Sequence, residues 1–166
     1  MDESRPRARP KHPRGAIFVR AIAVATAVVA LDQVAKQIAI HSVEPGHPVQ
    51  IMFGIEIANV RNPGIAFGLL SRSDAVILAI TLGALGVMAA YLALRHDRPG
   101  LWIAVGLLAG GAVANLVDRL RTGEVIDFID FPFWPAFNLA DVAIVAGAAG
   151  LALIFMTPDH KHATAD

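Results

Sequence analysis

Four long apolar segments constrain this chain more than any other feature of its sequence. They cover residues 16–40, 75–94, 101–117 and 139–156, and each approaches the roughly 20 residues that a helix needs to cross a bilayer. Mean hydropathy is +0.57 and 55% of the 166 residues are hydrophobic, more than a water-soluble domain of this length usually has. We therefore expect an all-α membrane protein with four transmembrane helices.

Polar tails flank this apolar region. Residues 1–15 hold five Lys and Arg interleaved with prolines and have little to bury, so we predict a disordered basic tail there. A secretory signal peptide is a poor interpretation of the first segment, because no clean cleavage site follows it and the segment continues into Asp32 and Lys36. The predicted organisation is a tail (1–15), one membrane domain (16–156) and a C-terminal tail (157–166).

Lys and Arg are unevenly shared between the two sides of the predicted spans. Eight lie in the two tails and the loop after the second span, and four lie in the other two loops. The positive-inside rule then places both termini in the cytoplasm. The two longer loops, which hold most of the polar motifs, are predicted to face outward.

The first outer loop, residues 44–70, has an unusual pattern. Ile51, Phe53, Ile55 and Ile57 alternate as on one face of a half-buried strand. Gly54 indicates a bulge or a close approach, and Asn62-Pro63-Gly64 is a turn signal. We expect a short sheet in the membrane interface over the helix ends, with residues 71–74 capping the second span.

Several chemistries are disfavoured by what the sequence lacks. It has no cysteine, which excludes disulfides, thiol catalysis and cysteine-based metal sites. Its six histidines lie in tails or loops without zinc-protease spacing, and there is no nucleophile elbow or phosphate-binding loop. The formal net charge is zero, so bulk electrostatics indicates no nucleic-acid partner.

Residues in the first span and in the first outer loop form candidate sites. Asp32 and Lys36 are four residues apart and can pair on one helix face; this pair either orients the helix or supports an outer site. In the first outer loop, Gly64 permits a backbone turn and Asn62 offers a donor and an acceptor from a defined position; the alternative is a plain turn.

The end of the third span carries Gly111, Asn115, Asp118 and Arg119 at spacings of three and four, so they project from one face. Asp118 opposes the helix dipole at a C-terminus and therefore needs a specific partner, with Arg119 or a backbone amide as candidates. Arg119 is then available to contact a substrate carbonyl. The alternative is a polar network that only fixes the helix end.

Two carboxylates lie fourteen residues apart around the start of the fourth span. Pro132 and Pro135 predict a compact turn between Asp127 and Asp141. Asn138 is a candidate N-cap that places Asp141 in the first helical turn, where the dipole favours its ionised form. Asp127 has apolar neighbours that favour its neutral form. Such a pair can act as acid and base, or both residues can simply cap loop backbone.

Taken in order, these motifs resemble those of lipoprotein signal peptidase, the signal peptidase II family. They are Asp32-Gln33-x-x-Lys36, Asn62-x-Gly64-x-Ala66-Phe67, Gly110-Gly111-x-x-x-Asn115-Leu116-x-Asp118-Arg119, Val125-Ile126-Asp127-Phe128 and Phe137-Asn138-Leu139-Ala140-Asp141. The resemblance runs from about residue 32 to 143. Each motif alone is weak, and their order and four-span layout make the combination specific.

The resemblance implies a bacterial inner-membrane aspartic endopeptidase that removes the signal peptide of diacylglyceryl-modified prolipoproteins before the lipid-modified cysteine. It implies four transmembrane helices with a small outer β-cradle and a short interfacial helix. It also implies a monomer that needs no metal or other cofactor, contacts membrane lipid and is inhibited by globomycin-like peptides. By motif match, Asp127 and Asp141 are catalytic. Supporting or substrate-binding positions are Asp32, Lys36, Asn62, Gly64, Asn115, Asp118, Arg119 and Asn138.

Two other functions stay open from the residues alone. A proton-coupled transporter would carry charges near the midplane of several spans, whereas here they gather at one side. A non-enzymatic membrane subunit would use its glycine-rich helices to dock a partner, and its function would survive Asp127→Asn and Asp141→Asn.

Overall fold

Four helices and one small sheet make up the computed structural model, which describes residues 14–63, 74–95 and 97–157. The helices are α1 (Arg14–Ser42), α2 (Asp74–Leu94), α3 (Leu101–Thr122) and α4 (Leu139–Met156). The strands are β1 (Val49–Met52), β2 (Ile55–Asn62), β3 (Val125–Phe131) and β4 (Trp134–Phe137). Most of the two predicted tails, and the predicted cap at 71–73, lie outside the described residues.

The helices confirm the predicted apolar segments to within a few residues, apart from the third. By length and composition, α1, α3 and α4 can each cross a membrane, and the apolar part of α2 covers Leu78–Leu94. Helix α3 runs five residues beyond its predicted end and stops at Gly123, which has a φ of 77°. A left-handed residue there is the usual helix stop. Within the described residues, the helices are α1 to α4, and the expected interfacial helix is not among them.

Helix α3 occupies the centre of the bundle, and glycines let its neighbours approach closely. A side chain at Gly106 or Gly110 would meet α1, and one at Gly111 would meet the Ala140 carbonyl of α4. Gly147 of α4 faces α3 in the same way. Small residues at crossing points are how membrane helices pack. Large apolar side chains such as Val19, Val87 and Val145 point outward and are more than 60% exposed, as lipid-facing residues are.

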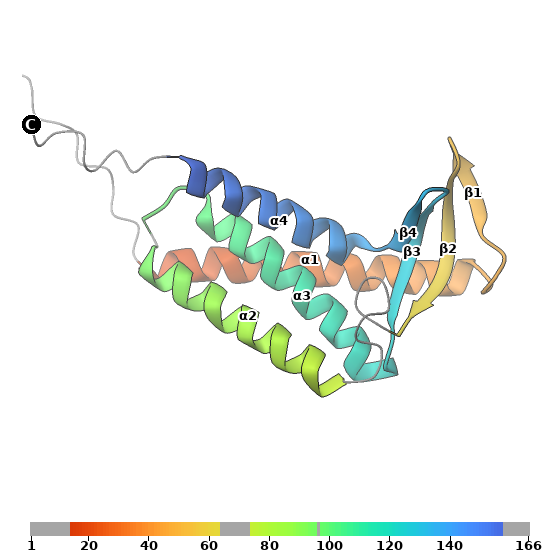
Figure 1. The fold of residues 1–166 in the computed structure, drawn as a ribbon, viewed down its shortest axis with the longest axis horizontal. Helices are drawn as coiled ribbons and strands as arrows, with labels where there is room; N and C mark the ends of the chain where they lie inside the picture. The colour runs from red at the N-terminus through yellow and green to blue at the C-terminus, as the bar shows by residue number, and fades with distance from the viewer. Residues whose placement is uncertain (1–13, 64–73, 96, 158–166) are drawn as a thin grey trace, which may run out of the picture.

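The four strands form one antiparallel sheet in the order β1-β2-β3-β4. In Figure 1 the sheet stands across the helix direction at one end of the bundle, beside the end of α1 and the start of α4. Two hairpins built from distant parts of the chain therefore meet where α3 ends and α4 begins. The proline-containing turn predicted between Asp127 and Asp141 is confirmed as the β3–β4 hairpin.

The short sheet predicted in the first outer loop is present, but the prediction that Phe53 shares one strand face with Ile51, Ile55 and Ile57 is wrong. Phe53 and Gly54 form a turn between β1 and β2, with φ values of 51° and 78°, so Phe53 leaves the strand face and is 91% exposed. The close approach predicted at Gly54 is present, since a side chain there would meet Pro132 at 3.2 Å.

Candidate active site

Asp127 lies on β3, on the side of the sheet that faces the helices. It is opposite Val60 of β2, and Asn62 is opposite Val125, so Asn62 is a diagonal neighbour of Asp127 on the same face. The Asp127 side chain is 2% exposed. Its Oδ2 accepts a hydrogen bond from Asn62 Nδ2 at 3.0 Å, and its Oδ1 accepts one from Asn138 Nδ2 at 2.6 Å. Both carboxylate oxygens are therefore held by amide donors.

Burial is the main reason that the pKa of Asp127 rises, to about 6 from an ordinary value of 3.8. The hydrogen bond from Asn62 lowers this pKa, and the nearby charge of Asp141 raises it. Desolvation and a second carboxylate both favour the neutral form. The prediction that apolar surroundings favour a protonated Asp127 is confirmed in direction.

Asp141 stands in the first turn of α4, as predicted. Asn138 is the N-cap: its Oδ1 accepts from the Asp141 backbone N–H at 2.9 Å, and its own backbone N–H donates to Asp141 Oδ2 at 3.2 Å. This reciprocal pair is a capping box. The other oxygen, Oδ1, accepts from Asn115 Nδ2 at 2.9 Å, and the Asp141 side chain is only partly buried. Donors from α3 and from the helix start thus hold a carboxylate that reaches the surface.

Asn138 connects the two carboxylates. Because a backbone N–H can only donate, the side-chain atom that faces the Asp141 backbone must be the amide oxygen. The amide nitrogen then points to Asp127. The fully buried Asn138 therefore contacts both aspartates and holds the end of β4 against the start of α4.

Beneath these carboxylates lies a buried ion cluster centred on Lys36, which is 1% exposed. Its Nζ lies 2.7 Å from Asp32 Oδ2 and 2.6 Å from Asp118 Oδ2, and it donates to Asn115 Oδ1 at 3.0 Å. Two ion pairs and one hydrogen bond thus hold the ammonium group. Asp32 also accepts from the backbone N–H of Ala140 at 2.9 Å. The predicted Asp32–Lys36 pair is confirmed, and it joins α1 to α3 and α4.

The prediction that Asp118 has a specific partner is confirmed, but neither candidate, Arg119 or a backbone amide, is that partner. Lys36 of α1 holds one of its oxygens, and Gln33 Nε2 donates to the other at 2.7 Å. Gln33 in turn accepts from Arg121 at 3.1 Å. Neither Gln33 nor Arg121 was among the predicted site residues. The spacing of three residues between Gln33 and Lys36 was the available signal, since it places both on one face of α1.

Two predicted site residues remain, Arg119 and Gly64. Arg119 lies on α3 and donates to the backbone oxygen of Asn115 at 3.3 Å, so its guanidinium is partly engaged with its own helix. Gly64 lies outside the described residues. The structure thus brings together Asp32, Lys36, Asn62, Asn115, Asp118, Asp127, Asn138 and Asp141.

Comparisons with known proteins agree with one another. The model of the signal peptidase (SPase) II family matches residues 24–157. The lipoprotein signal peptidase of Moorella thermoacetica is 41% identical over 137 residues, which cover 81% of this chain and 91% of that protein. The lipoprotein signal peptidase of Pelotomaculum thermopropionicum is 47% identical over 103 residues, covering 61% and 68%.

A solved structure has the same fold. It is described as a bacterial membrane enzyme determined by the in meso method at 2.3 Å resolution. It superposes with a TM-score of 0.78 at 30% identity and covers 88% of this chain and 94% of that one.

Proposed function

Since this chain belongs to the signal peptidase II family, we propose that Asp127 and Asp141 are the two catalytic aspartates of its site. The protein is a multi-pass membrane enzyme, an aspartic endopeptidase that removes signal peptides from prolipoproteins. The observation that carries the residue assignment is the shared clamp of Asn138, which contacts both carboxylates at once. The transporter and docking-subunit alternatives gain no support from these relatives.

The proposed topology has four spans with both termini in the cytoplasm and the sheet at the outer face. The basic residues near the N-terminus and after α2 support this orientation. The ends of α1 and α3 and the start of α4 then lie at the outer surface with the aspartates. A substrate anchored in the outer leaflet of the bacterial cytoplasmic membrane would present its cleavage site at this level.

The environments of the two carboxylates suggest separate roles. Asp141, at a helix N-terminus, is the candidate general base that takes a proton from water as the water oxygen attacks the scissile carbonyl carbon. Asp127, buried and with a raised pKa, is the candidate acid that protonates the carbonyl oxygen. When the C–N bond breaks, Asp141 gives its proton to the leaving amine and Asp127 recovers one from the tetrahedral intermediate. The pair returns to one shared proton.

Buried polar groups support this chemistry by fixing the donors around the carboxylates. The side-chain amides of Asn62, Asn115 and Asn138 each donate to one of the two aspartates. Lys36, which is paired with Asp32 and Asp118, donates to Asn115. We propose that Arg119 contributes a contact to the substrate backbone. This division of labour requires no metal, so cleavage is expected to persist in the presence of a chelator.

We propose that the substrate is a diacylglyceryl-modified prolipoprotein cut before its lipid-modified cysteine, and that the enzyme acts as a monomer. A cleavage assay tests this proposal. Purified protein in detergent should shorten a diacylated prolipoprotein, leave the unmodified precursor intact and be inhibited by globomycin. Equal cleavage of both precursors would refute the lipid requirement, and cleavage of neither would refute the function.

A further inference from the structure

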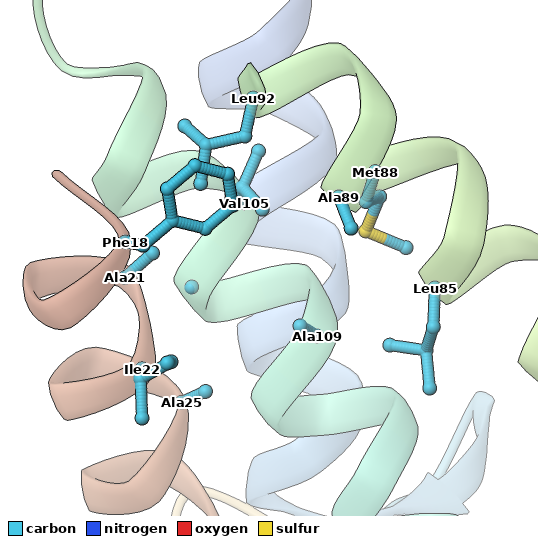
Figure 2. A pocket seen from close by; sticks show the side chains of 11 residues that line it. Phe18, Ala21, Ile22, Ala25, Leu85, Met88, Ala89, Leu92, Val105 and Ala109 are labelled. Carbon is cyan, nitrogen blue, oxygen red and sulfur yellow. The ribbon is translucent and has the colours of Figure 1, made fainter. Parts of the chain in front are cut away.

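An apolar pocket of about 140 Å³ lies between α1, α2 and α3, away from the aspartates. Figure 2 shows side chains from all three helices around it. None of the eleven lining residues is polar; they include Phe18, Ala25, Leu85, Leu92, Val105 and Ala109. The pocket therefore suits a hydrocarbon and offers nothing to a polar ligand.

The pocket extends along the helices. Its α1 lining extends from Phe18 to Ala25, seven residues or about 10 Å along a helix axis. At the Phe18 end, Leu92 approaches from α2 (Figure 2). A buried cluster adjoins the pocket and shares lining residues with it; the cluster consists of Ile17, Ala21, Leu92, Leu101 and Val105. At the other end, Ala25 and Leu85 stand on opposite sides of the pocket (Figure 2).

The Ala25 end of the pocket is the end nearer the active site. Phe18, Ala25 and Asp32 are seven residues apart in succession and share one side of α1. Asp32 belongs to the ion cluster under the aspartates, and Phe18 is fourteen residues, or about 21 Å, deeper along the helix. One leaflet of a bilayer has a hydrocarbon depth of about 15 Å. Ala25 is seven residues, or about 10 Å, from Asp32. The Ala25 end of the pocket therefore lies at the depth of the far half of an acyl chain whose headgroup is at the outer surface, and the Phe18 end lies deeper.

We infer that this pocket receives the methyl end of one fatty acyl chain of the lipid-modified substrate. The inference rests on the proposed function, because it assigns the chain to the diacylglyceryl group beside the scissile bond. The volume supports only the end of a chain, since a cavity of about 150 Å³ holds a molecule the size of benzene. Occupancy of the pocket then depends on the length of the acyl chain, because long chains reach it and short chains do not.

The test compares two variants on two substrates in the full-length enzyme. Ala89 of α2 lines the pocket, whereas its neighbour Ala90 does not, and both are exposed enough to accept a larger side chain. Ala89→Phe should fill the space, and Ala90→Phe is the matched control. The substrates are lipopeptides carrying two sixteen-carbon or two eight-carbon chains.

We expect Ala89→Phe to lower kcat/KM on the sixteen-carbon substrate about tenfold, roughly the effect of losing two buried methylenes. Its activity on the eight-carbon substrate should equal that of the parent, and Ala90→Phe should match the parent on both. An equal loss on both substrates would overturn the inference, because it would indicate damage to the fold or a pocket filled by bilayer lipid. Unchanged activity of Ala89→Phe would overturn it as well. A parent that cleaves neither substrate would instead refute the proposed function.

Discussion

Lys36 Nζ donates a hydrogen bond of 3.0 Å to Asn115 Oδ1, and this bond determines which end of the Asn115 amide faces Asp141. An ammonium group can only donate, so the amide oxygen must point to Lys36 and the nitrogen to Asp141, where it lies 2.9 Å from Oδ1. A buried charge on α1 thereby sets the environment of a carboxylate on α4 that it does not touch.

Replacing Asn115 by aspartate tests this relationship. Asn115→Asp keeps an acceptor for Lys36 and puts a second acceptor where Asp141 now receives a donor. Two facing carboxylates must share a proton at neutral pH, so we expect kcat to fall at least a hundredfold with a small change in KM. Partial recovery is expected at lower pH. Asn59→Asp is the control: Asn59 is a similarly buried asparagine that donates to the Val43 carbonyl. Neutral-pH activity unchanged in Asn115→Asp would contradict the assigned orientation.

Asn62 should influence the pH profile. Its hydrogen bond to Asp127 favours the ionised carboxylate and lowers the pKa of that group. Asn62→Ala should therefore raise the pKa of Asp127 further above about 6. The high-pH limb of the kcat/KM profile should then move to higher pH. The neighbouring Arg61→Ala, which removes only an exposed contact of 3.9 Å with Glu124, should leave the limb in place. A downward shift in Asn62→Ala would show that Asp127 does not act as the acid.

Ionisation of Asp127 should also affect stability. Its folded-state pKa of about 6 lies above the ordinary 3.8, so the folded protein holds this proton more tightly than the unfolded chain does. The resulting stability is present below about pH 4 and is lost as pH rises through 6. Asp127→Asn avoids that loss, so its free energy of unfolding relative to the parent should improve between pH 4 and 7 by at most about 3 kcal/mol. Thermal midpoints in detergent measure this difference, and a constant offset at both pH values would contradict it.

Close packing of α3 against α4 predicts a structural cost at Gly111. A side chain there would press on the Ala140 carbonyl and on Ile144, immediately beside Asp141. We expect Gly111→Ala to destabilise the protein by about 1–3 kcal/mol, as overpacking does, and to reduce activity by displacing the start of α4. Gly83→Ala on α2, where nothing lies within 4 Å, should have neither effect. Equal thermal midpoints for the two variants would argue against the tight crossing.

Local patterns predicted several parts of this structure well. The length of the apolar segment predicted the observed bounds of α4, Leu139–Met156. Lipid-exposed helices are defined by composition over many residues, so their extent can be predicted in this way. The capping box at Asn138 and the Asp32–Lys36 pair involve residues three or four apart. Such short-range geometry follows from helix spacing alone.

Features that depend on distant contacts were not predictable in the same way. The strand that carries Asp127 pairs with β2, about 65 residues earlier, and no local pattern specifies that partner. The ion pair between Asp118 and Lys36 joins α1 to α3. Both predicted candidates for the partner of Asp118, Arg119 and a backbone amide, were instead neighbours in the sequence. The turn at Phe53 required a residue with positive φ that is not glycine, which the alternating pattern concealed.

The most direct test of the central claim is cleavage of a diacylated prolipoprotein by Asp127→Asn and Asp141→Asn, with Asp130→Asn as the matched control. Asp130 lies on the same strand as Asp127, opposite Glu56. An asparagine side chain cannot act as a general acid or base. Each of the first two variants should therefore lose at least a thousandfold in kcat while keeping the thermal midpoint of a folded protein. Asp130→Asn should retain activity within a few-fold of the parent. Substantial cleavage by either Asp127→Asn or Asp141→Asn would contradict the assignment of these two residues as the catalytic pair.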